Sequence, residues 1–348
     1  MCSVHISQIG TAKKANLLES MNESLPEWLD GMQRELADEL EGQTCIYLDI
    51  NHWIKLRGAA HDESGASPVY GEILGLLKSL RQRREIFCPI SGPVLEELMK
   101  QSDSNSRSKT ARIMDFFSGG VCLRSWLELV EMQWFRDFTR VVLQRPVTHP
   151  EQPWTKVGFW AGAGHSENAH AIWALTVEQW QSLPNWIPAE HFVSRWVEDV
   201  KKARCEDKQA QQRRFAELEE HNRCELIRDL EEPMKSALRD RLSGRCDLVD
   251  GMFARLALQF IESTDRKIMP TLQVLAGLET AATLSNWKAD PHDFFDFLHA
   301  AVAIPYCTAL FTDRPLAQLL QHPSLDFASA YGKVILSEPD DILAYLKP

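Results

Sequence analysis

Two short, apolar runs of β-forming residues in this chain end in aspartate. TCIYLDI contains Asp49, and YCTALFTD ends at Asp313. If both runs form strands of one parallel sheet, the two carboxylates lie outside the carboxyl ends of the strands, where such sheets bind ligands. Carboxylates that lie close together raise one another's pKa unless a cation neutralises them. The pattern therefore predicts a site of hard oxygen ligands, which suits Mg²⁺ or Mn²⁺.

Two predicted helices begin near the same edge and add further acids. Glu96 and Glu97 belong to VLEELM, and Asp293 and Asp296 belong to HDFFDFLHAA. Consecutive helix residues point in different directions, so we expect only Glu97 of the first pair to face the site. A group of such carboxylates could hold two divalent ions, which activate a water and stabilise the leaving oxygen of a phosphodiester. The predicted chemistry is phosphodiester hydrolysis.

Each acid also has a purely structural interpretation. Asp49 would cap the helix that follows its strand, and Glu97 would belong to a solvated helix face. Asp296 would complement the dipole at the start of its helix, and Asp313 would open a turn before Pro315. The metal-site hypothesis therefore depends on these four acids occurring together rather than on any one of them.

Four residues beside the acids are candidates for contacting the substrate. Asn51 and His52 follow Asp49 closely. His299 lies three residues after Asp296, and Arg314 directly follows Asp313. A histidine at such a position could contact a phosphate or a leaving group. The alternative is a histidine on a helix face with a local hydrogen-bond partner.

The elements that must position these residues follow an α/β pattern. Apolar β-forming runs alternate with amphipathic stretches, and this alternation is typical of a parallel sheet flanked by helices. We predict strands at 44–50, 84–90, 120–125, 306–313 and 333–337. We predict helices at 24–42, 69–84, 91–101, 290–304 and 341–346.

Between the two α/β blocks the strand pattern almost disappears. We interpret residues 126–285 as an all-helical insertion into one α/β domain, which would consist of 44–125 and 286–348, after an N-terminal helical segment at 1–43. Within the insertion, Val197 to Leu242 is highly charged and predicts a long helix or helical pair. We expect Pro233 to interrupt it and Gly244 to end it.

The order of the acids resembles that of the PIN-domain nucleases. The similar stretches are YLDIN (47–51), CPISGPVLEEL (88–98), HDFFDFLHAA (292–301) and ALFTDRPL (309–316). The resemblance implies that Asp49, Glu97, Asp296 and Asp313 are both the catalytic residues and the metal ligands, with Asn51 close to the first of them. The insertion is far longer than in compact members. Residues 313–316 also depart from the common pattern, in which an Asn or Arg precedes the last acid.

The resemblance implies a PIN-like fold and a Mg²⁺- or Mn²⁺-dependent endonuclease that usually acts on RNA. A toxin or defence effector would be one setting for it, and the insertion could cover the site or hold a protein partner or inhibitor. Two alternatives stay open. One is a different Mg²⁺-dependent phosphohydrolase, although DIN (49–51) lacks the second aspartate of the Asp-x-Asp phosphatases. The other is a catalytically inactive PIN-like scaffold that serves as a protein-interaction module.

The bulk composition restricts the partners and the compartment. The 348 residues carry a formal net charge of −11, so any contact with nucleic acid requires a local basic patch or bound cations. The eight cysteines form no CxxC pair, which favours buried thiols in a reducing compartment. We see neither a signal peptide nor an apolar run long enough for a membrane span. We therefore expect a cytoplasmic protein with no membrane partner.

Overall fold

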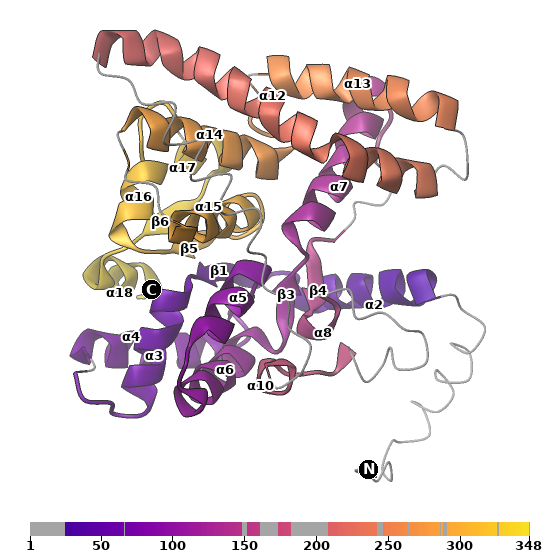
Figure 1. The fold of residues 1–348 in the computed structure, drawn as a ribbon. Coiled ribbons are helices and arrows are strands. Elements are labelled where there is room, and N and C mark those ends of the chain that lie inside the picture. Colours follow the sequence, from indigo (N-terminus) through magenta and orange to yellow (C-terminus); the bar gives the residue numbers. More distant parts are fainter. Residues whose placement is uncertain are drawn as a thin grey trace.

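The structure is a computed structural model in which helices surround a small parallel sheet (Figure 1). It describes residues 25–65, 67–147, 152–160, 173–181, 208–241, 246–263, 265–285, 287, 291–325 and 327–347. Two long helices, α12 (Lys208–Arg241) and α13 (Cys246–Glu262), lie along the upper side of the molecule in Figure 1, away from the sheet. The predicted N-terminal helix is present as α2 (Leu25–Leu40).

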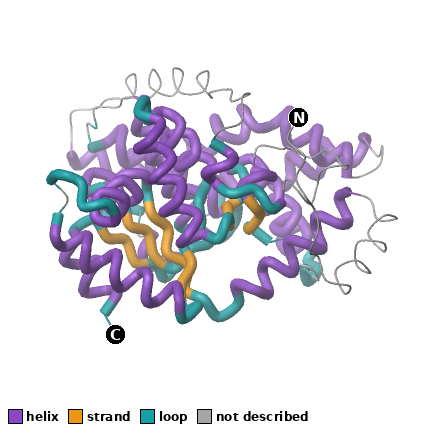
Figure 2. Tube along the Cα trace, turned by 90° about the horizontal axis from the view of Figure 1, so that it is seen from below, coloured by secondary structure: helices purple, strands orange, loops and turns teal. Residues whose placement is uncertain are grey.

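The central sheet confirms the predicted α/β fold with a parallel sheet. Its four strands are β1 (Thr44–Leu48), β2 (Ile86–Phe87), β5 (Ala309–Phe311) and β6 (Val334–Leu336). They pair in the order β2-β1-β5-β6, and all three pairings are parallel. Figure 2 shows the strands side by side with helices on both sides of them. Because β1 and β5 are the two central strands, the residues that follow them lie at the middle of one sheet edge.

The helices of the first block begin where the sequence places good caps. They are α3 (Ile50–Ala60), α4 (Pro68–Gln82), α5 (Gly92–Lys100) and α6 (Ser104–Ser118). Asp49 caps α3, and Ser91 caps α5 with a proline directly inside the helix, a position where the missing N–H costs nothing. Asp103 caps α6 and accepts from the amides of Asn105 and Ser106. Side chains therefore satisfy the first free N–H groups of α3, α5 and α6, whereas α4 begins without a side-chain cap hydrogen bond.

A second, two-stranded sheet corrects the prediction of an all-helical insertion. The predicted third strand is present as β3 (Val121–Leu123), and it pairs antiparallel with β4 (Trp154–Lys156), which lies inside the middle region. A parallel bridge between Ile90 and Cys122 joins this pair to the segment that follows β2. The middle region is therefore mostly rather than entirely helical. Its one described strand is only three residues long and carries no alternating pattern.

The remaining middle elements are helices. They are α7 (Trp126–Asp137), the π-helix η2 (Phe138–Val142), α8 (Val157–Trp160), α10 (Val177–Trp180), α12, α13 and α14 (Pro270–Leu284). The expected interruption at Pro233 is wrong, because α12 continues across it. Leu230 and Met234 on either side are buried in the core, so packing outweighs the local loss of a hydrogen bond. Gly244 and residues 197–207 lie outside the described residues.

The C-terminal block packs against the middle region through one core. Its helices are α15 (Pro291–Ala303), α16 (Arg314–Leu320), α17 (Phe327–Tyr331) and α18 (Pro339–Leu346). Helix α14 lies against α15 and α16 and is buried along most of its length. Five cysteines are free thiols, and all but Cys224 are buried: Cys45, Cys88, Cys122, Cys224 and Cys307. Among the described residues, no helix is both long and apolar enough to cross a membrane.

Candidate functional site

Two of the predicted acids lie side by side at the carboxyl edge of the central strands. Asp49 follows β1 directly, and Asp313 lies two residues after the end of β5. Each also caps a helix: a carboxylate oxygen of Asp49 accepts from the His52 amide at 3.1 Å, and one of Asp313 accepts from the Leu316 amide at 3.0 Å. The cap occupies one oxygen of each carboxylate. Helix capping and a ligand role are therefore compatible at both positions.

Asp296 joins these two residues from α15. Its pKa is raised to about 7, first by burial and then by the charges of Asp313, Glu97 and Asp49, while His299 lowers it. The pKa of Asp313 is raised in the same way, first by burial and then by Asp49 among others. The structure thus places the four acids predicted from the sequence close enough for the charges of Asp49, Glu97 and Asp313 to shift the pKa of Asp296. They come from four separate segments of the chain.

The fourth acid, Glu97, is held by a buried hydrogen-bond chain that the sequence did not reveal. His299 Nε2 lies 2.7 Å from Glu97 Oε2, and His299 Nδ1 lies 2.6 Å from Tyr47 Oη. Tyr47 Oη in turn lies 2.5 Å from Ser91 Oγ. The Tyr47 and Ser91 side chains are fully buried. The chain therefore joins β1, the cap of α5 and the middle of α15 behind the acidic edge.

The charge of His299 follows from its surroundings. Burial lowers its pKa, but the negative charge of Glu97 and the hydrogen bond to it outweigh burial, so the net shift of the pKa is upward. A protonated ring donates from both nitrogens, to Glu97 and to the Tyr47 oxygen, which leaves the tyrosine hydroxyl to donate to Ser91. His299 is 1% exposed and both its nitrogens have protein partners, so it is placed to orient Glu97.

The other predicted substrate residues divide into one buried and two exposed side chains. His52 is buried; its Nε2 lies 3.1 Å from the Thr312 carbonyl oxygen and its Nδ1 lies 2.9 Å from Tyr70 Oη. It therefore ties the end of β5 to α4, as Tyr47 and His299 tie β1 to α15. Asn51 and Arg314 are exposed at the rim of the acidic edge. These two are the candidates that solvent and a large substrate can reach.

Two acids outside the predicted set of four also lie close by. Asp293 is 8% exposed, and its charge contributes to the raised pKa of Asp313. Glu96 is half-buried, and its pKa is raised to about 7, first by burial and also by the charge of Glu97, while Lys100 and His299 lower it. A helical face with acids at 293 and 296 was visible in the sequence, but burial of the first of them was not.

The donor chemistry of this edge fits a hard divalent cation, but the carboxylates would have to move closer together to hold one. Carboxylate oxygens are the preferred ligands of Mg²⁺ and Mn²⁺, and the raised pKa of Asp296 reflects burial and repulsion by its acidic neighbours. In the described part of the chain, no three His, Cys, Asp or Glu side chains converge closely enough to hold an ion. Binding an ion would therefore require side-chain movement, and the ion would relieve the repulsion.

Comparisons with protein-family models, curated proteins and solved structures found no match to this chain. The class that the fold defines is an α/β protein with a four-stranded parallel sheet, whose carboxyl edge carries clustered acids.

Proposed function

We propose that this chain is a Mg²⁺- or Mn²⁺-dependent endonuclease that hydrolyses RNA at the carboxyl edge of its central sheet. The observation that carries the proposal is the grouping of Asp49, Glu97, Asp296 and Asp313 at one sheet edge, where burial first and then the charges of the other three acids raise the pKa of Asp296 to about 7. Carboxylates whose pKa is perturbed by burial and by one another are typical of functional sites. The order of these acids along the chain, which resembles that of PIN-domain nucleases, supports the same class.

In this mechanism the four acids hold the ions, and their neighbours fix the geometry. A bound divalent ion would neutralise the cluster, lower the pKa of a water and stabilise charge on the leaving oxygen. Glu97 is kept in place by His299, which Tyr47 holds from the opposite side. The Asp49 and Asp313 carboxylates are fixed by the backbone amides that they cap. At the rim, the exposed Arg314 is placed to pair with a phosphate of the RNA.

The net charge makes the ion necessary for binding as well as for chemistry. A chain of −11 with an acidic edge repels a polyanion, so RNA would approach only after cations occupy the cluster. The preference for RNA over DNA and the toxin or defence setting rest on the family resemblance alone. A protein partner or inhibitor on the middle region belongs to the same proposal.

One observation favours a second candidate, the catalytically inactive scaffold. Asp49 and Asp313 both have a structural role as helix caps, Glu97 has a histidine partner, and the described ligands do not converge on one point. In that case the α/β domain would only present the middle helices to a protein partner. A different Mg²⁺-dependent phosphohydrolase would use the same acids on a smaller substrate.

Cleavage of a labelled RNA with Mg²⁺, with Mn²⁺ and with EDTA separates these functions. We expect cleavage with either metal, none with EDTA, and a loss of about a hundredfold or more in Asp49→Asn. Asparagine keeps the helix cap, so the fold should survive. Asp103→Asn is the matched control, because Asp103 is also an N-cap aspartate, of α6, and lies outside the cluster.

Equal cleavage by the wild type and Asp49→Asn, or no cleavage with any metal, would overturn the nuclease proposal. Cleavage of a phosphomonoester but not of RNA would replace it with the phosphohydrolase.

A further inference from the structure

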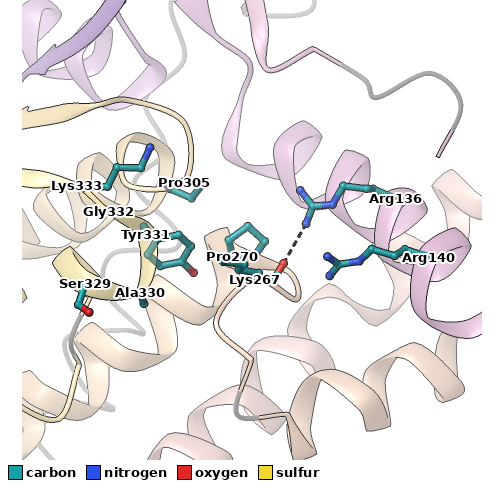
Figure 3. A pocket seen from close by; sticks show the side chains of 10 residues that line it. All are labelled: Arg136, Arg140, Lys267, Pro270, Pro305, Ser329, Ala330, Tyr331, Gly332 and Lys333. Carbon is teal, nitrogen blue, oxygen red and sulfur yellow. Dashed lines mark hydrogen bonds between the residues drawn. The ribbon is translucent and has the colours of Figure 1, made fainter. Parts of the chain in front are cut away.

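A basic pocket lies at the opposite edge of the same sheet. It has a volume of about 600 Å³ and is lined by α7 and η2 on one side, and by the start of α14 and the α17–β6 turn on the other. Lys333 directly precedes β6 and Pro305 precedes β5, so the pocket opens at the amino edge of these parallel strands. Figure 3 shows the guanidinium groups of Arg136 and Arg140 pointing toward Tyr331 and Pro270.

The lining concentrates positive charge in a chain that is otherwise acidic. Arg136 and Arg140 come from the continuous α7–η2 segment, Lys267 and Lys333 come from two other segments, and none of the ten lining residues is acidic. Two carboxylates interact with the lining: the buried Asp137 pairs with Arg136, and the exposed Asp265 interacts electrostatically with Tyr331. Four cations against two carboxylates leave a positive excess where the whole chain carries −11. Such a local excess recruits anions despite the net charge.

The four cations are not equivalent. Arg136 donates to both carboxylate oxygens of Asp137 at 2.9 Å and also donates to the Lys267 carbonyl oxygen at 3.3 Å, so it braces the loop before α14. Arg140 makes one longer contact with the same carboxylate, at 3.3 Å. Among the described residues, neither Lys267 nor Lys333 has a carboxylate within ion-pair distance. Arg136 therefore has a structural role, whereas the side chains of Arg140, Lys267 and Lys333 are available to bind a ligand.

The remaining wall suits a flat, apolar group. Pro270 and Pro305 line it together with the ring of Tyr331. Tyr331 Oη donates to the Arg266 carbonyl oxygen, which fixes the ring in place. A fixed aromatic ring beside proline rings offers a stacking surface for a nucleobase, and the cations opposite it offer partners for phosphates.

We propose that this pocket binds a small phosphorylated molecule of the nucleotide class. Its volume lies within the ordinary range for small-ligand sites, roughly 300–1,000 Å³. Arginine matches phosphate oxygens with two parallel N–H donors, and lysine adds point charges around them. The pocket opens at the sheet edge opposite the acids, so a strand of RNA bound for cleavage would have to pass around the sheet to reach it. The proposal is therefore independent of whether the acidic edge cleaves RNA.

The nucleotide proposal is tested with a variant that lacks the three available cations and keeps Arg136. Binding of ATP, GTP, inorganic phosphate and adenosine is measured by calorimetry and thermal unfolding in EDTA, so that metals do not engage the acidic edge. The pocket variant is Arg140→Gln, Lys267→Gln and Lys333→Gln. The control variant, with the same change in net charge, is Arg34→Gln, Arg83→Gln and Arg228→Gln, all of them exposed residues in surface ion pairs.

We expect ATP or GTP to bind the wild type and the control and to raise their unfolding temperature, and adenosine to bind neither. Inorganic phosphate should bind at the same cations more weakly than the nucleotides. The pocket variant should bind nucleotide at least about a hundredfold more weakly, because each lost charged hydrogen bond is worth roughly tenfold. The proposal fails if no phosphorylated probe binds, or if the pocket variant binds like the control. It also fails if a short single-stranded RNA, but no nucleotide, depends on these cations.

Discussion

The two edges of one small sheet differ in how far their buried acids are compensated by positive charge. At the carboxyl edge, acids from four segments face one another while His299 opposes their repulsion, and the pKa of Asp296 rises to about 7. At the amino edge, the buried acid Asp137 has two arginines and the Met269 amide as partners. A satisfied buried ion pair is typical of structure, and an uncompensated cluster is typical of function. The net charge of the chain reveals neither site.

The largest effect should come from breaking the satisfied pair. Asp137→Asn keeps the shape and an oxygen for the Met269 amide, but it leaves Arg136 without its counter-charge in a largely enclosed position. We expect a loss of roughly 3–5 kcal/mol in the free energy of unfolding, measured by urea denaturation. Adding Arg136→Gln should recover part of that loss, since the uncompensated charge is then removed. A loss below about 1 kcal/mol would show that the pair does not brace the amino edge.

The next-largest effect tests whether the buried His299 positions Glu97 at the acidic edge. His299→Gln removes the imidazole that holds Glu97 while keeping a side chain that can form hydrogen bonds. We expect cleavage to fall by about 10- to 100-fold and the Mg²⁺ concentration for half-maximal activity to rise, as for other groups that orient metal ligands. His61→Gln, at the exposed C-cap of α3, is the control. A lower rate with an unchanged Mg²⁺ dependence would contradict a positioning role.

Replacing Asp296 should stabilise the fold, whereas replacing Asp137 should destabilise it. The pKa of Asp296 is about 7 in the fold against an ordinary value of 3.8, so the folded state binds more protons between these values. Stability from this group is therefore present at low pH and is lost as pH rises toward 7. Without metal, Asp296→Asn should stabilise the protein at pH 8 by on the order of 1–2 kcal/mol and change little at pH 4.

Urea denaturation of Asp296→Asn and the wild type at both pH values checks this. Saturating Mg²⁺ should shrink the difference at pH 8, because an ion would stabilise the wild type selectively. Equal stabilisation at pH 4 and pH 8 would mean that the carboxylate charge is not its cause.

The sequence predicted the elements whose cause is local. Apolar runs that end in Asp49 and Asp313 marked β1 and β5, and a serine followed by a proline marked the start of α5. The four acids were identified because each lies at the end of a strand or in a helix beside the same sheet edge. Their electrostatic contact in the structure agrees with that placement, while their role as metal ligands stays a prediction.

What the sequence could not predict depends on contacts between distant segments. The strand β4 has three residues and exists because β3 offers it a partner. Tyr47 looked like one more apolar strand residue, and only the approach of α15 gives its hydroxyl the partner His299. The basic pocket could not be predicted for the same reason, since its cations are spread along the chain from α7 to the residue before β6. Local patterns carry no information about such distances.

The smallest effect should come from the far end of the hydrogen-bond chain. Tyr47→Phe keeps the buried ring and removes only the hydroxyl that joins Ser91 to His299. We expect a loss of about 1 kcal/mol in the free energy of unfolding. If the protonated ring of His299 donates to Tyr47 Oη, the variant should also lower the pKa of His299, because the charged form loses an acceptor.

Nuclear magnetic resonance titration of the His299 ring measures that shift, and Tyr70→Phe is a matched control. Tyr70 forms the equivalent tyrosine–histidine contact with His52, at 2.9 Å, and its loss should leave His299 unchanged. A rise in the pKa of His299 in Tyr47→Phe would mean that the hydrogen bond has the opposite direction, with the Tyr47 hydroxyl donating to a neutral His299 ring. Glu97 would then face a weaker partner, and the acidic edge would be still less compensated than the amino edge.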